Sequence, residues 1–145
     1  MEKLRLTRKF EFEAAHLLNN YDGLCKNLHG HSYKLFITVI GEIEININSP
    51  KLGMVIDFKD LKEIVKENIL DKFDHSLIVS RKNKLPEEII NTNKIIFTDF
   101  QPTAENLVIF FVNILKEKLP INIKLCNVKL FETENSSAEW NASDN

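Results

Sequence analysis

The sequence has few cysteines and no surplus of positive charge, and both features restrict what the protein can be. Only 2 of the 145 residues are cysteines, so the fold cannot depend on a network of disulfide bonds. Lysine and arginine together number 19, against 21 aspartates and glutamates, and no basic stretch with interleaved aromatic residues occurs. We therefore expect no nucleic-acid partner.

Long apolar runs are absent as well. No stretch is long enough to cross a membrane, and no apolar signal segment follows Met1 and the charged residues next to it. We therefore expect no membrane partner and a cytoplasmic location. Apolar residues nevertheless make up 43% of the chain, which is enough for a core and predicts one globular domain over residues 1–145.

Hydrophobic periodicity predicts an α+β fold. The expected order is strand, strand, helix, helix, strand, strand, over about residues 3–18, 29–47, 58–71, 103–119, 122–132 and 138–141. Asp57 and Thr103 are the expected N-caps of the two helices. Residues 80–94 are polar and are expected to form an exposed loop, with a candidate short strand at 95–97. Together these elements predict a four-stranded antiparallel sheet with two helices covering one face.

Three of the four histidines are concentrated in the two expected N-terminal strands. On the first strand, His16 has the same parity as the apolar Phe12, and on the second, His29 and His31 have the parity of Tyr33. Residues of one parity share one face of a strand. If the two strands pair as an antiparallel hairpin, the three imidazoles converge on one inward point.

Burying three imidazoles beside apolar side chains is costly unless a partner satisfies their nitrogens, and a divalent metal is such a partner. Three histidines without a fourth protein ligand are typical of catalytic zinc, whereas structural zinc sites are closed by four ligands. The alternative is that these are ordinary histidines of the core or surface, and imidazole also suits iron, copper and nickel. We predict a Zn²⁺ site made by His16, His29 and His31.

Other candidate residues are ambiguous when considered alone. Cys25 precedes His29 by four positions in a loop, and Asp74 and His75 follow the first predicted helix. Such an Asp-His pair is more often simply solvated. Glu132 ends the even-numbered face of the strand 122–132, on which Cys126 is expected to be buried, but a glutamate at a strand end is also usually solvated.

Six segments, in order along nearly the whole chain, resemble the family of 6-pyruvoyltetrahydropterin and 6-carboxytetrahydropterin synthases. They are His16, Cys25-x-x-x-His29-Gly30-His31, Val55-Ile56-Asp57-Phe58, Asp74-His75, Pro102-Thr103-Ala104-Glu105-Asn106 and Glu132-Thr133. The resemblance implies the tunnelling fold, in which subunits join their sheets into a trimeric barrel and two trimers stack into a homohexamer. It also implies that the three histidines hold zinc.

The resemblance further implies a reaction. The three residues between Cys25 and His29 are similar to the spacing in bacterial 6-carboxytetrahydropterin synthases, whereas animal pyruvoyl synthases have a longer gap. The implied substrate is 7,8-dihydroneopterin triphosphate. The implied products are 6-carboxy-5,6,7,8-tetrahydropterin, acetaldehyde and triphosphate, on the route to the deazapurine of queuosine.

Catalytic roles follow from the same resemblance and from the chemistry of each group. Cys25 is the expected general base, because a thiolate beside the reacting carbon can accept a proton. Asp74 and His75 are expected to form a relay with Cys25. Adjacent residues of an extended chain point apart, so a direct bond between Asp74 and His75 requires a turn there.

Substrate binding is expected at a second group of residues. Glu132 is the expected anchor of the pterin ring, because a carboxylate can accept hydrogen bonds from a ring N–H and the exocyclic amine. Thr103 and Glu105 are candidates to line the pterin pocket, although helix capping explains both almost as well.

Three other functions remain open from the sequence. The first is 6-pyruvoyltetrahydropterin synthesis, in which triphosphate is eliminated without cleavage of a carbon-carbon bond. The second is a non-catalytic module that binds zinc and pterin, which would have little use for Cys25, Asp74 and His75. The third is a zinc hydrolase or hydratase, which would leave Cys25 and Glu132 without a role.

Overall fold

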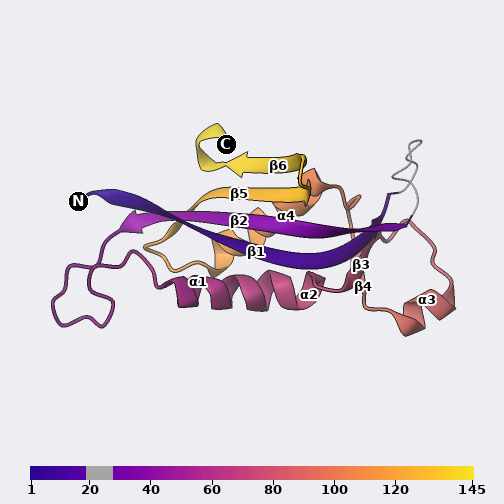
Figure 1. Ribbon diagram of the computed structural model, residues 1–145, viewed down its shortest axis with the longest axis horizontal. Helices are drawn as coiled ribbons and strands as arrows, with labels where there is room; N and C mark the ends of the chain where they lie inside the picture. The colour runs from indigo at the N-terminus through magenta and orange to yellow at the C-terminus, as the bar shows by residue number, and fades with distance from the viewer. Residues whose placement is uncertain (19–27) are drawn as a thin grey trace.

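The computed structural model describes residues 1–18 and 28–145, and Figure 1 shows its long strands and helices. The strands form one six-stranded mixed sheet in the order β4-β3-β1-β2-β5-β6. Their bounds are β1 Lys3–Leu17, β2 His29–Glu42, β3 Ser76–Ser80, β4 Ile95–Thr98, β5 Lys124–Thr133 and β6 Ser136–Asn141. β1, β2, β5 and β6 are antiparallel neighbours, whereas β3 is parallel to both β1 and β4.

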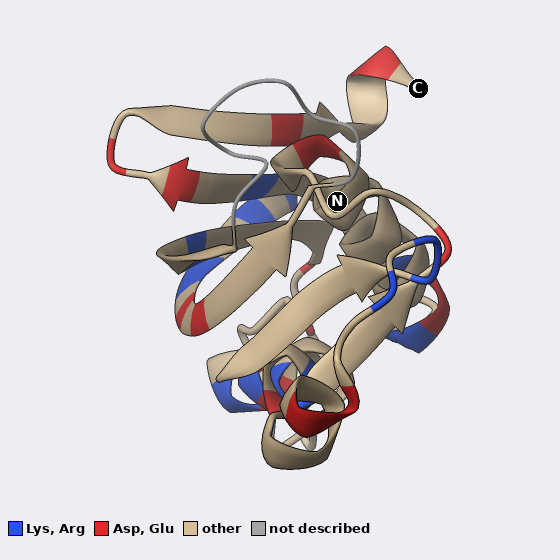
Figure 2. Cartoon of the chain, turned by 90° about the vertical axis from the view of Figure 1, so that its right-hand side faces the viewer, with Lys and Arg blue, Asp and Glu red and all other residues tan. Residues whose placement is uncertain are grey.

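Two helical stretches pack on the sheet. The first is continuous through α1 Phe58–Val65, a π-helical turn η2 Lys66–Leu70 and α2 Asp71–Phe73, and the second is α4 Ala104–Lys118. A short helix α3 Glu87–Thr92 and a 3₁₀ turn η3 Ala142–Asp144 complete the helices of the described residues. Figure 2 shows Lys and Arg positions interspersed with Asp and Glu positions along the chain.

The expected N-caps are confirmed for both main helices. The Asp57 side chain accepts a hydrogen bond from the backbone N–H of Lys59, and the Thr103 side chain accepts one from the N–H of Asn106. Each cap satisfies a backbone donor that has no partner within its helix. Both helices therefore begin where the sequence predicts.

The core lies between the helices and one face of the sheet. Along β1 the even positions Phe10, Phe12, Ala14 and His16 are buried, as the period-two pattern predicts. The ring of Phe12 stacks on Tyr33 of β2, with ring centroids 5.0 Å apart, and meets Phe111 of α4 edge-on at 6.1 Å. This aromatic packing joins the β1–β2 hairpin to α4.

The four predicted antiparallel strands are present, but the sheet has six strands, because β3 and β4 extend it in parallel to β1. β3 was missed because its run Leu77-Ile78-Val79 is short and follows directly on the helix. All five residues of β3 are buried, which is typical of a parallel strand covered on both faces. The polar segment 80–94 contains α3 as well as loop, and the candidate strand at 95–97 is confirmed as β4.

A β-bulge changes the expected orientation of Cys126. The pairing of β2 with β5 shifts register between Thr38 and Val39, so that Leu125 and Val128 are both buried although three residues apart. Cys126 is only partly buried, and its sulfur accepts a hydrogen bond from Nε of Arg5 at 3.1 Å. The prediction of a buried Cys126 is therefore wrong.

The second strand is shorter than predicted: β2 ends at Glu42 and does not extend to residue 47. The chain then folds back on itself, since the N–H of Glu44 donates to the carbonyl of Met54 at 2.9 Å and the N–H of Gly53 to the carbonyl of Glu44 at 2.8 Å. Ile45 and Ile47 are exposed in this loop, so their alternation does not mark a strand.

Candidate functional site

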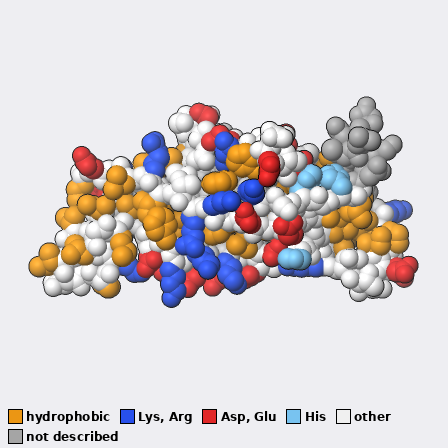
Figure 3. Space-filling view, viewed as in Figure 1, with side chains coloured by type: hydrophobic (Ala, Val, Ile, Leu, Met, Phe, Trp, Pro, Cys, Tyr) orange, Lys and Arg blue, Asp and Glu red, His pale blue; other side chains and the backbone are white. Residues whose placement is uncertain are grey.

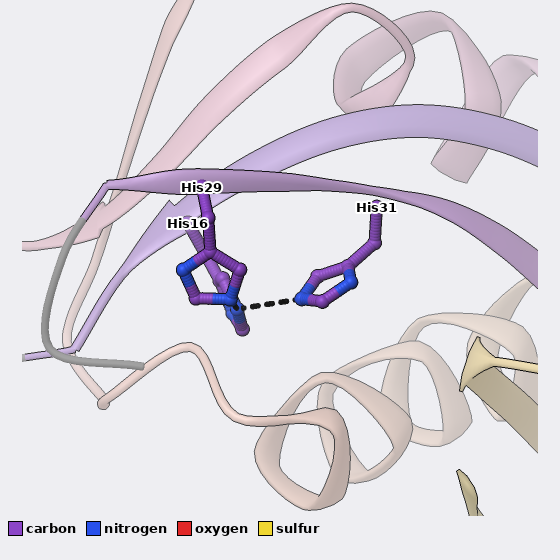
Figure 4. A group of neighbouring side chains, drawn as sticks. All are labelled: His16, His29 and His31. Carbon is purple, nitrogen blue, oxygen red and sulfur yellow. Dashed lines mark hydrogen bonds between the residues drawn. The ribbon is translucent and has the colours of Figure 1, made fainter. Parts of the chain in front are cut away.

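The three predicted metal ligands lie together at one end of the β1–β2 hairpin. The register pairs His16 with His29 and Ala14 with His31, so all three imidazoles point to the inward face of the sheet (Figure 4). Nε2 of His16 lies 2.8 Å from Nε2 of His29 and 3.2 Å from Nε2 of His31. One nitrogen from each residue falls within 4.8 Å of the others. The convergence expected from strand parity is therefore present.

The start of α4 determines which nitrogen of His16 faces the cluster. Nδ1 of His16 lies 2.7 Å from the carbonyl oxygen of Pro102, and His16 is only 1% exposed. A carbonyl can only accept, so Nδ1–H is the donor and the neutral ring presents the Nε2 lone pair to His29 and His31. A carbonyl that orients a histidine in this way is typical of the surroundings of a metal ligand.

The donor set fits a metal ion. Zn–N bonds of about 2.0–2.1 Å in a tetrahedral site place two ligating nitrogens roughly 3.3 Å apart. The nitrogens of His16 and His31 are 3.2 Å apart and those of His16 and His29 are 2.8 Å apart, so these two separations must change by only a few tenths of an ångström on binding. The three histidines can therefore hold a metal, and imidazole ligands suit zinc among other ions.

Glu132 lies beside this cluster, near the end of β5. Its Oε1 is 3.6 Å from Nε2 of His31, and its side chain is 24% exposed. The structure thus brings the predicted pterin anchor and the predicted metal ligands to one place. From the inward face, Tyr33 adds a hydroxyl 3.4 Å from Nδ1 of His16. Burial, and then the nearby Glu132 carboxylate, raise the pKa of Tyr33 far above its usual value, so its hydroxyl stays protonated.

Burial also sets the charge state of the histidines. Burial lowers the pKa of His16. The Pro102 carbonyl and the Glu132 carboxylate partly oppose this lowering, and His29 adds to it. Burial likewise lowers the pKa of His31, again opposed by Glu132. Both rings are therefore held neutral, which is the state that binds a metal.

These lowered pKa values predict how the metal-free protein responds to acid. The unfolded chain, with histidines of ordinary pKa near 6.5, binds protons before the folded protein does. The stabilisation is thus fully present above that pH and is lost as the pH falls through the lowered folded-state values. Thermal unfolding of the chelator-treated protein should occur a few degrees lower at about pH 5.5 than at about pH 7.5. An equal or higher melting temperature at the lower pH would contradict this.

Asp74 and His75 form the direct contact that was expected, and the structure has the turn that this contact needs. His75 adopts a left-handed backbone conformation with φ of 58°, and its Nδ1 lies 3.0 Å from Oδ1 of Asp74. Glu13 holds both residues, because its N–H donates to Oδ1 of Asp74 at 2.9 Å and its carbonyl accepts from the N–H of His75. The hydrogen bond from the Glu13 N–H lowers the pKa of Asp74; burial opposes this effect, and the contact with His75 adds to it.

This pair lies on the other face of the sheet from the metal ligands. Glu13 has the outward parity of β1, and a cavity of about 280 Å³ beside His75 is lined mainly by outward residues such as Ala15, Gly30 and Ser32, although His31 also reaches its lining. The structure therefore does not bring Asp74 and His75 into the histidine cluster of the same chain. Cys25, their expected partner, lies outside the described residues.

The remaining predicted residues lie at the start of α4. Thr103 caps the helix, and Glu105 is in its first turn, where a negative charge favours the helix dipole. The residue that sequence reasoning missed is their neighbour Pro102, whose carbonyl orients His16. Its role depends on a backbone oxygen, for which residue type gives no signal. Tyr33 could have been found, since it shares the parity of His29 and His31.

A cavity of about 810 Å³ lies at the opposite end of the hairpin and has no histidine in its lining. Figure 3 shows hydrophobic side chains gathered at the end where the N-terminus lies, away from the pale blue histidines. Size alone would make this cavity the default site. The histidine cluster is the better candidate, because its donors converge, and the cavity's Asp57 and Asp60 are both paired with Lys51.

Comparison with known proteins decides the family. The family model described as 6-pyruvoyl tetrahydropterin synthase matches residues 5–143. The chain belongs to the 6-pyruvoyl tetrahydropterin synthase family. It is 38% identical over 141 residues to a 6-carboxy-5,6,7,8-tetrahydropterin synthase of Haemophilus influenzae, covering 94% of this chain and 97% of that protein. It is 31% identical over 144 residues to the human 6-pyruvoyl tetrahydrobiopterin synthase, covering 91% and 87%.

Solved structures agree with this family. The 6-pyruvoyl tetrahydropterin synthase of Caenorhabditis elegans superposes with a TM-score of 0.73 at 25% identity, over 98% of this chain and 97% of that chain. The expected tunnelling fold is thus confirmed for this pterin synthase, with β3 and α3 as additions to the predicted elements. Among the described residues, no helix is long and apolar enough to span a membrane.

Proposed function

We propose that this pterin synthase is a zinc-dependent 6-carboxy-5,6,7,8-tetrahydropterin synthase of queuosine biosynthesis. Its substrate would be 7,8-dihydroneopterin triphosphate, and its products 6-carboxytetrahydropterin, acetaldehyde and triphosphate. The observation that carries the proposal is the cluster of His16, His29 and His31, with the Glu132 carboxylate 3.6 Å from His31. The relative from Haemophilus influenzae, at 38% identity, supports the carboxy product.

Each group near the cluster has a part in this proposal. The three histidines hold zinc, which as a Lewis acid would make the hydroxyls of the substrate side chain more acidic. Pro102 keeps His16 oriented, and Glu132 binds the ring edge of the pterin. Thr103 and Glu105 lie at the start of α4, next to Pro102, whose carbonyl contacts His16. Their part is to line the same pocket.

Cys25 is the proposed general base, supported by Asp74 and His75. Oδ1 of Asp74 accepts from Nδ1–H of His75, which leaves Nε2 of His75 as the nitrogen that exchanges a proton. A positioned base contributes typically about 10²- to 10⁴-fold to a rate, so these residues account for a large part of the proposed catalysis.

The location of Asp74 and His75 supports a site shared between subunits of a homohexamer. They are bonded to Glu13 on the outward side of β1 and are not part of the group of converging histidines, so the relay would serve the cluster of a neighbouring copy. The sheet also has edges that could join such copies. Among the described residues, β3 pairs with only Ala14–Leu17 of β1, which leaves the N-terminal part of β1 without a neighbouring strand on that side. At the far side of the sheet, β6 is the outer strand. Unpaired edges of this kind are templates for pairing with another chain.

Replacing Glu132 with glutamine should raise KM for the pterin substrate about 100-fold, since a hydrogen-bonded charge is lost from a partly buried site. The turnover number should change much less. Steady-state kinetics on zinc-loaded protein would measure both, and Glu139→Gln, on the exposed surface of β6, is the matched control. An unchanged KM for Glu132→Gln would exclude this residue as the pterin anchor.

Product analysis tests the proposed reaction against its rivals. The zinc-loaded protein would be incubated with 7,8-dihydroneopterin triphosphate, followed by mass detection of the pterin and chemical trapping of aldehyde. A 6-carboxy product with acetaldehyde supports the proposal. A 6-pyruvoyl product without acetaldehyde would assign the activity that the human relative's name describes. Tight pterin binding without turnover would indicate a binding module, and simple hydrolysis of the triphosphate a zinc hydrolase.

A further inference from the structure

The turn that carries Asp74 and His75 is held by a lysine from a distant part of the chain. Nζ of Lys94 donates to the carbonyl oxygen of Asp71 at 2.6 Å and to that of Asp74 at 3.0 Å. The last carbonyls of a helix lack partners within it, and a lysine at this end also favours the helix dipole. One ammonium group therefore joins the end of α2 to the turn that follows.

Other contacts commit Lys94 to this position. Its backbone carbonyl accepts from the N–H of Leu77 at 2.8 Å, at the point where β3 and β4 begin to pair. Leu77 is only two residues beyond His75, so the base of the lysine side chain is fixed close to the turn. The carboxylate of Asp71 is already paired with Lys66 at 2.9 Å, and that of Asp74 is bonded to the Glu13 N–H and to His75. The ammonium of Lys94 is thus directed to backbone oxygens rather than to an acidic side chain.

The turn needs such support because its conformation is unfavourable. His75 is the only non-glycine residue of the described chain with a positive φ, and a histidine in this region costs free energy that neighbouring contacts must offset. The N–H of His75 is bonded to Glu13, and the hydroxyl of Ser76 donates to the carbonyl of Phe73 at 2.6 Å. Lys94 adds a third contact, to the carbonyl of Asp74 within the turn itself.

We propose that Lys94 is a positioning residue, whose ammonium group holds the left-handed turn and so directs the imidazole of His75 toward its reaction partner. The effect of Lys94 on turnover rests on the proposed function. Its effect on the conformation of the turn does not. Lys94 belongs to the β3–α3–β4 segment, which the sequence does not predict as part of the sheet. Holding this turn gives that segment a role.

The test replaces Lys94 with methionine, which keeps the length of the side chain and removes its charge. Hydrogen exchange of the segment 73–77 should become about tenfold faster, because two charge-assisted hydrogen bonds are lost, while exchange in the paired region of β1 and β2 should not change. The turnover number should fall about tenfold through misplacement of His75. KM and zinc content should stay within about twofold of wild type.

Two companion variants separate positioning from general damage. Lys94→Arg keeps donors that reach carbonyl oxygens and should restore both exchange and turnover. Lys84→Met, an exposed lysine of the same β3–β4 connection, should behave as wild type. Unchanged exchange in Lys94→Met overturns the proposal, as does faster exchange with normal turnover. A wild-type protein without synthase activity would instead overturn the proposed function, and the exchange data would still decide whether Lys94 holds the turn.

Discussion

Replacing His31 with glutamine is expected to abolish both metal binding and turnover. His31 supplies one of three converging nitrogens, so the variant keeps only two ligands. Metal affinity should fall by at least about 100-fold, more than the loss of a residue that merely orients a ligand. Turnover should fall by about 10³-fold or more, because the metal is expected to supply several kcal/mol of charge stabilisation. Elemental analysis after dialysis, together with a turnover assay, measures both effects.

His75→Gln is the matched control, since it makes the same substitution in a residue that is 78% exposed and lies on the other face of the sheet. This variant should lose turnover and keep its full metal content. Circular dichroism would confirm that both proteins are folded. Full metal occupancy in His31→Gln would contradict the assignment of the cluster, and loss of metal in His75→Gln would place His75 among the ligands.

The second large effect is expected for Cys25→Ala. If Cys25 is the general base, turnover should fall about 10²- to 10⁴-fold, whereas the metal content should not change, because the three histidines complete the protein's ligand set. Single-turnover kinetics on metal-loaded protein would show whether the chemical step itself is slowed. This prediction rests on chemistry and family resemblance, since Cys25 lies outside the described residues.

Cys126→Ala controls for the loss of a thiol. Cys126 lies on the outward face of β5 in contact with Arg5, so its removal should leave turnover within about twofold of wild type. Normal turnover in Cys25→Ala with normal metal content would exclude Cys25 as the base. Loss of metal in that variant would indicate that Cys25 acts as a fourth ligand instead.

The convergence of the three histidines could be predicted from the sequence because strand parity is a local property. His16, His29 and His31 share parity with buried aromatic residues, and a hairpin then brings them together without any further information. The helix starts at Asp57 and Thr103 were predictable for the same reason, since an N-cap bonds a backbone group only two or three residues away.

Features that depend on distant parts of the chain could not be predicted. β3 has too few residues to show a period, and its parallel pairing with β1 is determined by tertiary packing. The bulge that turns Cys126 outward depends on the register of β5 against β2. The bond from Pro102 to His16 joins residues 86 positions apart through a backbone oxygen. None of these contacts can be recognised from the local sequence around the residues that form it.

The most direct test of the proposed function is the stoichiometry of products from one preparation of zinc-loaded protein. We predict that each 7,8-dihydroneopterin triphosphate consumed yields equal amounts of 6-carboxytetrahydropterin, acetaldehyde and triphosphate, and that His31→Gln yields none of them. Triphosphate released without acetaldehyde, together with a pterin that keeps its three-carbon side chain, would contradict the proposed carbon-carbon cleavage.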